Sequence, residues 1–558
     1  MFENVDPKFL PPPEHRPLLT FGHPSLHYGW SRPTFNAATE LLDRSVARVG
    51  ADHRAILHVT DGGVRTWSYG DLAGAVSRLA NGLRALGVSP GDRVLMRAGE
   101  VPEAAVIQLA VWKIGAIIVP AAVVEMAREL VFMLNDTEAV AVVCESANAE
   151  ELEKALPECP SVRWAIGWPE PIAGQGLTLD GVMSGQPDSC DAHPTRPLDG
   201  AGIFYTGGTT GRPKGCLHTH VAEVALADLN GWARGLDQQS VLLTHAPLGH
   251  AFGNGEKINF PLRAGASVVY ASRPTPQTMW ELIAEHRVTT LAGAATMYRM
   301  MLQACPEPGS AYPGIAVTTA LSSGEILDPR TFHSWREQLG IPLRNVVGMT
   351  PIRHLFIDSN QAGVKVAPGL SVGAPLPGYE ARLVGEDGQP TIDPDAPGRL
   401  AIRGPSGITY WINEHPAIRD RAATDVRQGW SFLDDAYRRD EEGWLWFEGR
   451  LDDMIVTGGR QVAPIEVEEV LGNHPAVAEV AVVSAPDEVR GQVVAAFVCL
   501  QSGYDPSTEL AKELQEHAKA TMAGYKYPRR LEFVDTLPKD QVGKIQRRKL
   551  REQLAAEG

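Results

Sequence analysis

Hydrophobic and polar positions alternate regularly along the first part of the chain. Short apolar runs at Arg54–Val59, Asp92–Met96 and Ala139–Val143 have the length and composition of buried strands. An amphipathic stretch with helical spacing at Tyr69–Leu86 and a second expected helix at Pro102–Ile114 lie between them. Strands that alternate with helices of this length predict a parallel sheet covered by crossover helices.

A second series of apolar runs continues this pattern further along the chain. Strands are expected at Val241–Leu243, Ser267–Tyr270, Thr289–Leu291 and Ala316–Ser322. Residues 166–200, which are rich in Gly, Pro and Asp, are expected to form a loop before the next strand.

The pattern changes near residue 453, where helices and strands mix over a shorter span. Helices are expected at Ile465–Leu471 and Ser507–Met522, and strands at Val477–Val483, Val493–Leu500 and Leu531–Val534. The predicted fold class is therefore α/β. It consists of a large N-terminal body of several subdomains with mixed sheets (residues 1–451) and a small C-terminal α+β domain (residues 452–558).

Composition narrows the functional classes. The 558 residues carry a formal net charge of −16, which argues against a general nucleic-acid binder. The six cysteines are scattered without zinc-ligand spacing, so a metal or disulfide framework is not expected. No stretch approaches the ~20 apolar residues of a membrane span. The N-terminal segment lacks the apolar core of a signal peptide, and we expect a soluble, cytoplasmic protein.

A segment rich in Gly and Thr carries the strongest chemical signal. It follows an apolar strand and runs from Tyr205 to Gly215. Glycines let backbone N–H groups approach an anion, while threonine hydroxyls and a lysine add donors and charge. The segment lacks the Gly-Lys-Ser/Thr ending of a Walker A loop, so it predicts a different kind of phosphate cradle. Its expected contacts are Thr206, Gly207, Gly208, Thr209, Thr210, Gly211 and Lys214.

This segment resembles the phosphate loop of the adenylate-forming superfamily (acyl-CoA synthetases, luciferases and adenylation domains), except that the family usually has Ser where Gly207 stands. Five further motifs follow in the family's order, and the resemblance covers roughly residues 35–555, nearly the whole chain. They are Ser322–Glu325 (the adenine-side turn), Gly348–Thr350 (the start of the phosphate and Mg²⁺ loop), Asp435 (the ribose), Gly449–Asp453 (the hinge) and Pro538–Ile545 (the catalytic lysine).

The resemblance implies ATP, Mg²⁺ and coenzyme A as cofactors and implies roles for particular residues. Lys544 would bridge the acid and the α-phosphate, with Thr350 and His250 as further catalytic residues. Fixed cations and N–H donors are needed because the first step brings an anionic carboxylate to ATP. Beyond the phosphate loop, the implied ATP and AMP contacts are Ser323, Gly324, Glu325, Asn345, Val347, Gly348, Met349, Thr350, Asp435 and Arg450.

The second step is transfer of the acyl group to coenzyme A. It needs a thiol at the acyl carbon, and Lys544 stands beside that carbon. In the family the C-terminal domain is a mobile lid that rotates about a hinge, withdraws the lysine and opens a thiol tunnel. The resemblance assigns the hinge to Asp452 and the coenzyme A tunnel to Gly458 and Gly459. The basic residues of the C-terminal stretch fit coenzyme A phosphates, and they equally fit a solvated helix face.

The segment Ala246–Gly255 bears on the identity of the acid. It holds no acidic residue, whereas adenylation domains for amino acids usually place an Asp here against the substrate amine. The segment resembles instead the benzoate- and 2-aminobenzoate-CoA ligase branch. The implied pocket for a flat ring comprises Ala251, Phe252, Gly253, Gly324, Gly348, His354 and Leu355, although Phe252 also fits an ordinary core position.

One departure from the family pattern affects the metal. Pro351 stands where the family usually has a Glu that helps to bind Mg²⁺, and proline offers no ligand. Thr350 is the remaining expected contact, because Mg²⁺ keeps several waters. Glu325 or Asp358 would be the compensating carboxylate.

The expected function is an ATP-dependent ligase that activates benzoate, 2-aminobenzoate or salicylate and transfers it to coenzyme A. Transfer to the pantetheine arm of a carrier protein is an open alternative. A weakly active or non-catalytic homologue that binds nucleotide and acyl group is another. A homodimer is an open option for the oligomeric state. A hydrolase is disfavoured: Gly369–Gly373 matches a nucleophile-elbow pattern, but Pro368, Pro375 and Pro377 leave no room for the helix that must follow.

Overall fold

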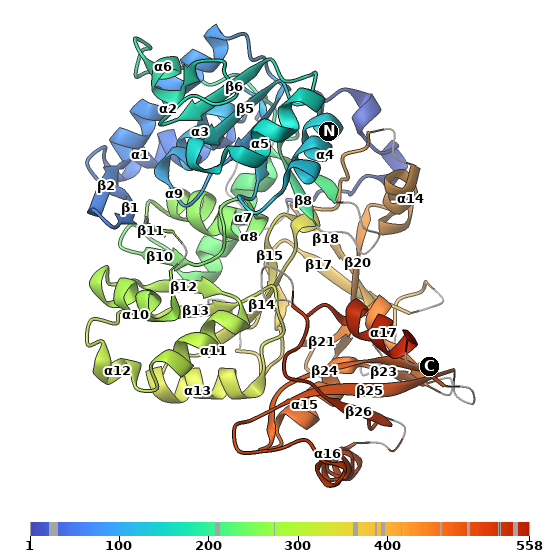
Figure 1. Cartoon of the computed structure of the whole chain (residues 1–558). Helices are drawn as coiled ribbons and strands as arrows, with labels where there is room; N and C mark the ends of the chain where they lie inside the picture. Colours follow the sequence, from blue (N-terminus) through green and yellow to red (C-terminus); the bar gives the residue numbers. More distant parts are fainter. Residues whose placement is uncertain are drawn as a thin grey trace.

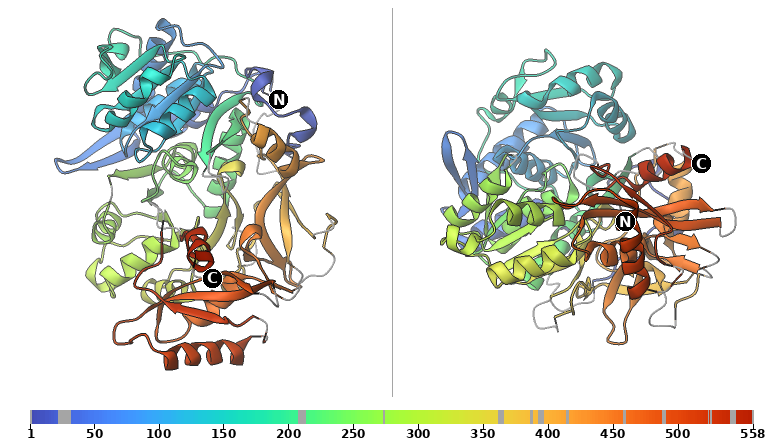
Figure 2. Two further views of the ribbon diagram at one scale, coloured as in Figure 1. Left: turned by 45° about the vertical axis from the view of Figure 1, so that its right-hand side comes forward. Right: turned by 60° about the horizontal axis from the view of Figure 1, so that its bottom comes forward.

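A computed structural model defines the three-dimensional arrangement of the chain (Figure 1). The described residues are 2–21, 32–206, 213–272, 274–360, 366–385, 388–391, 397–413, 416–457, 460–487, 491–522, 524, 526–539 and 545–556. Among these residues the strands form four sheets. Three sheets belong to a large body, and the fourth forms a small domain below it (Figures 1 and 2).

A seven-stranded sheet lies at the top of the body in Figure 1, in the order β7-β6-β5-β3-β4-β8-β9. Alternate residues of β3 point into two separate apolar cores, Val94 and Met96 into one and Leu95 into the other. A sheet covered on both faces explains why its strands are continuous apolar runs. The strands are β3 (Arg93–Arg97), β4 (Ile117–Ala121), β5 (Ala141–Glu145), β6 (Trp164–Trp168), β7 (Leu177–Thr178), β8 (Gly200–Thr206) and β9 (Lys214–Thr219).

Two of the helices in this region, Tyr69–Ala85 and Pro102–Lys113, lie where the sequence pattern predicts them. Ser68 and Asp71 form a reciprocal capping box that starts α2, and Pro102 occupies the first turn of α3. The helices of this region are α1 (Arg44–Val49), α2 (Tyr69–Ala85), α3 (Pro102–Lys113), α4 (Ala127–Thr137), α5 (Glu150–Ala155) and α6 (Leu179–Met183).

A nine-stranded sheet follows, in the order β16-β15-β14-β13-β12-β10-β11-β1-β2. Strands β10, β12, β13 and β14 are parallel neighbours, so their carboxyl ends meet at one edge, where open α/β sheets bind ligands. The strands are β1 (Arg54–Thr60), β2 (Gly63–Ser68), β10 (Val241–Thr244), β11 (Ser267–Ala271), β12 (Thr290–Gly293), β13 (Thr319–Ser322), β14 (Leu343–Gly348), β15 (Leu355–Asp358) and β16 (Ala374–Pro375).

The helices of this second region pack on both faces of the nine-stranded sheet (Figure 1). A π-helical turn, Gly255–Asn259, joins α8 to α9 in one continuous run. The helices are α7 (His220–Arg234), α8 (Ala251–Asn254), α9 (Phe260–Ala264), α10 (Pro276–Glu285), α11 (Ala295–Ala304), α12 (Pro308–Ala311) and α13 (Pro329–Leu339).

A five-stranded sheet at the right of Figure 1 completes the body. Its elements are β17 (Glu380–Val384), β18 (Gly398–Arg403), α14 (Pro416–Asp425), β19 (Val426–Arg427), β20 (Trp430–Arg439) and β21 (Leu445–Arg450).

The small domain has a sheet of its own, with α15 and α16 on one face and α17 on the other. Val467 of α15 and Leu514 of α16 share one apolar core, whereas Leu550 and Leu554 of α17 lie in the second. Its elements are β22 (Ile455–Thr457), β23 (Arg460–Val462), α15 (Pro464–Gly472), β24 (Val477–Asp487), β25 (Gly491–Leu500), α16 (Thr508–Thr521), β26 (Arg530–Phe533) and α17 (Arg547–Ala556).

The predicted α/β class with a smaller C-terminal domain is confirmed, but one local prediction is wrong. Residues 166–200 are not a plain loop, because they contain the end of β6, the short strand β7 and helix α6. Leu179 and Val182 of α6 are buried. A Cβ on Gly82 would lie 2.3 Å from the Val182 carbonyl oxygen, so α2 and α6 can approach this closely only at a glycine. The division at residues 451 and 452 stays a prediction.

A buried arginine ties the seven-stranded and nine-stranded regions together. Arg353 is 1% exposed, and its Nε donates to a carboxylate oxygen of Glu223 on α7 at 2.7 Å. Its two terminal nitrogens donate to the Ala251 carbonyl at 2.9 Å and to Asn254 Oδ1 at 2.6 Å, and its guanidinium lies 3.9 Å from the ring centroid of Phe204 on β8. One side chain thus joins β8, α7 and α8.

The backbone of Arg353 is held in an unusual conformation. Its φ is +80°, a region that costs a non-glycine residue roughly 1–3 kcal/mol. Such strain persists only where the surroundings fix the residue, and the network extends beyond its first partners. Asn259 Nδ2 donates to the other carboxylate oxygen of Glu223 at 2.7 Å, and Asn254 Nδ2 donates to Gln108 on α3 at 2.7 Å.

Removal of Glu223 should leave the charge of buried Arg353 uncompensated in the core. We expect Glu223→Ala to lower the free energy of unfolding by about 3–5 kcal/mol, measured by urea denaturation. The control is Glu380→Ala, which breaks an ion pair with Arg403 whose glutamate is 54% exposed and should cost at most about 1 kcal/mol. Equal losses in the two variants would contradict the role given to Arg353.

Candidate active site

The predicted phosphate loop joins two antiparallel strands, β8 and β9. Thr206, the last residue of β8, pairs with Lys214, the first residue of β9, so both ends of the loop are fixed by the same hairpin. The Lys214 ammonium lies 5.7 Å from the ring centroid of Tyr410. Gly207, Gly208, Thr209, Thr210 and Gly211 lie outside the described residues.

Strand β9 also fixes the position of Thr350. His218 on this strand donates from Nε2 to the Thr350 carbonyl at 3.0 Å. Burial lowers the pKa of His218 to about 3, with the nearby charge of Arg353 adding to the effect. The imidazole is therefore neutral at ordinary pH and keeps the Nε2 proton for this hydrogen bond. The hairpin that carries the phosphate loop thus also holds the start of the predicted phosphate and Mg²⁺ loop.

The predicted adenine-side turn follows β13 at the ligand-binding edge of the nine-stranded sheet. The Ser323 backbone N–H donates to the Gly293 carbonyl at 3.0 Å, and Gly324 has a φ of +82° that favours glycine. The Glu325 carboxylate accepts from the backbone N–H of Thr296 in the first turn of α11 at 2.9 Å. Its other oxygen, Oε1, is buried without a hydrogen-bond partner in the described part of the chain.

The neighbouring strand β14 supplies Asn345, Val347 and Gly348, and Met349 follows it. The Asn345 amide donates to the Leu370 carbonyl at 2.7 Å, so part of its hydrogen-bonding capacity is already used. A Cβ on Gly348 would lie 2.7 Å from a methyl carbon of Leu355. A side chain at this position would have to displace Leu355 and would press against the His354 backbone, 3.0 Å away.

An apolar patch lies at the same edge. Ala292, Leu321, Val346 and Leu355 form a small buried cluster, and partly buried Phe252 packs against it. These residues come from the carboxyl ends of β12, β13 and β14 and from β15 and α8. Phe252 is therefore neither a fully buried core residue nor a free surface residue. Its place suits one wall of a site for an apolar ligand.

His354 lies behind this wall. Its ring stacks on Phe252 at 5.3 Å between centroids and meets Phe260 edge-on at 4.5 Å, while Nε2 donates to the Phe252 carbonyl at 2.9 Å. Burial, reinforced by the charge of Arg234, holds the pKa of His354 well below its usual value. A Cβ on Gly255 would lie 2.4 Å from the imidazole. Neutral, buried His354 thus fixes both the ring and the backbone of Phe252.

The segment before α8 places His250, Ala251 and Gly253. His250 is partly exposed at the N-terminus of α8, where its carbonyl accepts from the Asn254 N–H at 2.9 Å. Ala251 is buried, and its carbonyl is the one that Arg353 binds. A Cβ on Gly253 would lie 2.2 Å from the Pro247 carbonyl oxygen, so the glycine allows the loop to fold against the helix.

A buried ion pair that the sequence analysis missed anchors this segment. Lys257, 1% exposed in its side chain, pairs with Glu100 and donates to the Ala246 carbonyl at 2.7 Å. Glu100 in turn accepts from the Leu248 N–H at 3.0 Å. Burial lowers the pKa of Lys257, and Glu100 opposes that effect. The sequence around Lys257 is mixed, with Glu256 before it and Ile258 after it, so it gives no signal that the lysine is buried or that Glu100 is its partner.

The two predicted ribose residues are neighbours on adjacent strands. Asp435 on β20 and Arg450 on β21 are directly paired, with Arg450 Nε 4.0 Å from an Asp435 carboxylate oxygen. The preceding residue, Asp434, points to the other face of the strand and pairs with Arg421.

The predicted hinge lies between the body and the small domain. Asp452 is part of a short turn, Leu451–Asp453, that separates β21 from β22. The next residue, Asp453, forms an ion pair with Arg551 of α17 at 2.7 Å. Lys544, Gly458 and Gly459 lie outside the described residues.

The basic C-terminal stretch is largely engaged within the small domain. Lys526 pairs with Glu466 at 2.5 Å, Arg547 with Glu468 at 2.6 Å and Arg548 with Glu552 at 2.7 Å. These pairs favour structural and solvated roles for the three side chains over a dedicated phosphate site.

The donors for Mg²⁺ can be tested against the structure. In the parts of the chain that the structure describes, no three His, Cys, Asp or Glu side chains form a metal site. Asp358 is an unsuitable ligand because Arg344 binds both of its oxygens, at 3.0 and 2.5 Å. Glu325 is the better candidate, since its buried Oε1 has no partner among the described residues. A carboxylate oxygen is a ligand that Mg²⁺ favours.

The hydrolase alternative fails on geometry. Ser371 is 0% exposed, and its hydroxyl donates to the Leu445 carbonyl at 2.8 Å and accepts from the Gly373 N–H at 3.1 Å. No helix follows it before the short strand β16. A nucleophile must be accessible and free to lose its proton, and this serine is neither.

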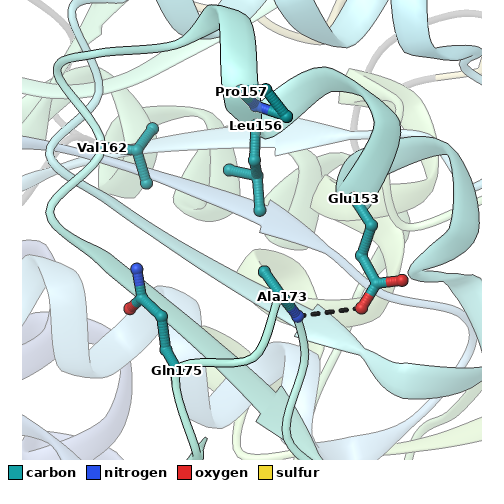
Figure 3. A pocket seen from close by; sticks show the side chains of 6 residues that line it. All are labelled: Glu153, Leu156, Pro157, Val162, Ala173 and Gln175. Carbon is teal, nitrogen blue, oxygen red and sulfur yellow. Dashed lines mark hydrogen bonds between the residues drawn. The ribbon is translucent and has the colours of Figure 1, made fainter.

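A surface cavity of about 330 Å³ lies far from these residues, beside α5 and β6 (Figure 3). Its polar side chains already have partners in the fold. Glu153 accepts from the Ala173 N–H at 2.8 Å, and Gln175 accepts from the Ala165 N–H at 2.8 Å. The other lining residues, Leu156, Pro157, Val162 and Ala173, are apolar, so the cavity has few polar side chains and the strand-end edge remains the candidate site.

Comparison with known proteins gives consistent results. Residues 42–410 match the AMP-binding enzyme family, and residues 466–544 match the AMP-binding enzyme C-terminal domain. The chain is 34% identical over 535 residues to a 3-hydroxybenzoate–CoA ligase of Aromatoleum sp. (strain CIB), covering 93% of this chain and 97% of that one. It is 34% identical over 529 residues to the benzoate–CoA ligase of Thauera aromatica, covering 93% and 96%.

A solved structure, that of the anthranilate CoA ligase AuaEII in complex with anthranoyl-AMP, superposes with a TM-score of 0.84 at 28% identity, covering 94% of this chain and 99% of that one. No helix in the described part of this chain is long and apolar enough to cross a membrane. The resemblance to the adenylate-forming superfamily and its aryl-CoA ligase branch is confirmed. The chain belongs to the AMP-binding enzyme family.

Proposed function

We propose that the protein is an acid–thiol ligase that converts an aromatic carboxylic acid and ATP into an acyl-adenylate and then transfers the acyl group to coenzyme A. One observation carries the proposal: the partly buried face of Phe252 and the predicted adenine-side turn lie at the same strand-end edge. That edge would place an aromatic acid beside a nucleotide. The ligases of benzoate and 3-hydroxybenzoate, each 34% identical to this chain, support the same chemistry.

The chemistry follows from charge. A carboxylate resists nucleophiles because it is anionic, and joining it to AMP removes the charge and creates a leaving group. The negative charge gathered with the phosphates must be offset by fixed donors, and loss of one such donor typically costs ~10²–10³ in rate. In this chain the donors are the N–H groups of the loop between β8 and β9, Lys214 and Lys544, while Asp435 and Arg450 hold the ribose.

Mg²⁺ would be carried in on the phosphates and offset their charge, with Glu325 and the Thr350 hydroxyl as its protein ligands. His250 would stand at the reacting carboxylate, and Phe252, Ala251, Gly253, Gly324, Gly348 and Leu355 would surround the ring. Gly458 and Gly459 would line the thiol path. Transfer to a carrier protein, a homodimer and a cytoplasmic location stay predictions.

The direct test is pyrophosphate release from Mg-ATP with a panel of acids. Benzoate, 2-aminobenzoate, 3-hydroxybenzoate, salicylate and hexanoate should be compared at equal concentration. The aromatic acids should release pyrophosphate well above hexanoate, because a flat ring fits against Phe252. Nucleotide binding without pyrophosphate release for every acid would favour a non-catalytic homologue.

Lys544→Ala should separate the two half-reactions. We expect acyl-adenylate formation to fall by about 10²-fold or more, because the cation at the α-phosphate is lost. Thioester formation from preformed aryl-AMP and coenzyme A should stay near wild type. Lys512→Ala, at an exposed position of α16, is the control and should change neither. Equal losses in both half-reactions would contradict the role of Lys544.

Asp452→Pro tests the hinge and should affect the other half-reaction, transfer to coenzyme A. Proline fixes φ near −65° and so restricts rotation of the small domain. Acyl-adenylate formation should persist while transfer to coenzyme A is lost, measured as separate half-reactions. Unchanged thioester turnover would show that rotation does not occur at Asp452.

Phe252→Ala tests the acid wall. Loss of the ring should raise the KM for benzoate by about tenfold, because aromatic contact and burial are both removed. The KM for ATP should change little. Phe332→Ala, in α13 and outside the apolar patch, is the control. A larger change in the KM for ATP than for benzoate would place Phe252 elsewhere than at the acid.

A further inference from the structure

We propose that Arg299, Glu479 and Lys539 form a latch that positions the segment carrying Lys544 for acyl-adenylate formation and releases it for thioester formation. The three residues act through the lysine rather than on the substrate. The inference rests on the proposed function, since it assigns the latch to one of its two half-reactions.

The two ends of the segment that carries Lys544 are held together. Lys539 and Ile545 form an antiparallel bridge, and the Gln546 N–H donates to the Pro538 carbonyl at 2.8 Å. Leu537 and Ile545 pack into the apolar core beneath α17. Any group that fixes Lys539 therefore fixes one end of the segment that contains Lys544, which we call its base.

Glu479 of β24 fixes that base. Its two carboxylate oxygens accept from the Lys539 ammonium at 2.9 and 2.8 Å. Both side chains are about one-third exposed, at 28% and 31%, so water weakens the pair without abolishing it.

The same carboxylate reaches across to the body. Nη2 of Arg299, in α11, lies 3.5 Å from a Glu479 oxygen, so one glutamate joins a cation of the body to a cation of the small domain. Arg299 is itself oriented by its neighbours. Nη2 donates to Thr296 Oγ1 at 3.2 Å, and Nη1 lies 3.7 Å from a carboxylate oxygen of Asp328.

Arg299 lies near the predicted nucleotide site, so its contact with Glu479 depends on where the small domain sits. Thr296 is the residue whose backbone N–H binds Glu325, so Arg299 lies one step from the predicted adenine-side turn. The latch therefore closes only when the base of the Lys544 segment faces the nucleotide side of the body. Rotation that withdraws Lys544 must carry Glu479 away from Arg299 and break the contact.

Glu479→Gln tests the latch by removing the charge while keeping the shape. We expect acyl-adenylate formation, measured as pyrophosphate release, to fall by about three- to tenfold, as befits partly exposed ion pairs. Thioester formation from preformed aryl-AMP should be unchanged or faster. Arg299→Gln breaks the same contact from the body and should act alike. The double variant should lose no more than either single variant.

Glu516→Gln is the matched control. Glu516 pairs with Lys519 on α16 of the same domain, so its loss should change neither half-reaction. Added salt should slow adenylation by the wild type and have less effect on Glu479→Gln, since salt screens the latch. A merely structural role for Glu479 would lower both half-reactions together. That result, or additive losses in the double variant, would overturn the latch.

Hydrogen exchange of the apo protein gives a readout that needs no substrate. Amides of residues 534–539 and of the first turn of α11 should exchange faster in Glu479→Gln than in the wild type, whereas α16 should not change. Unchanged exchange in both segments would overturn the latch. A wild type that releases no pyrophosphate with any acid would refute the proposed function instead, and the exchange result would still decide the latch.

Discussion

The rest of the site depends on one buried ion pair, that of Arg353 with Glu223. A buried charge is costly unless every donor is used, and here the arginine binds a carboxylate, a carbonyl, an amide oxygen and an aromatic face. Those partners belong to the strand before the phosphate loop, to α7 and to the helix that carries Phe252. Arg353 directly follows the Thr350–Ile352 turn in the chain. The ion pair thereby fixes the strand before the phosphate loop relative to the helix that carries Phe252.

Two further buried contacts extend this arrangement. Neutral His218 holds the Thr350 carbonyl from β9, and the Lys257–Glu100 pair holds the loop that leads to His250. In each case a polar group inside the protein fixes a backbone segment rather than facing the ligand. An acidic chain can handle ATP and coenzyme A in this way, because local donors on fixed backbone offset the phosphate charge without a basic surface.

Much of the fold could be predicted because its signal is local. Strands β3 and β5 and helices α2 and α3 follow from apolar runs and helical spacing, and Ser68 and Pro102 mark helix starts. Helix α6 was missed because Leu179 and Val182 are too few to give a pattern within a turn-rich segment. Family motifs indicated Asp435 and Arg450, which the structure brings together. The carboxylate partners of Arg353 and Lys257 could not be predicted, because Glu223 and Glu100 lie 130 and 157 residues away from them in the chain.

The central claim is that the carboxylate itself attacks the α-phosphate of ATP. An aromatic acid labelled with heavy oxygen in its carboxyl group tests this directly. If an acyl-adenylate forms and is then cleaved by the thiol of coenzyme A, the AMP released must carry one labelled oxygen, which mass spectrometry detects. Unlabelled AMP together with labelled inorganic phosphate would show that the acid is activated by another route and would contradict adenylation.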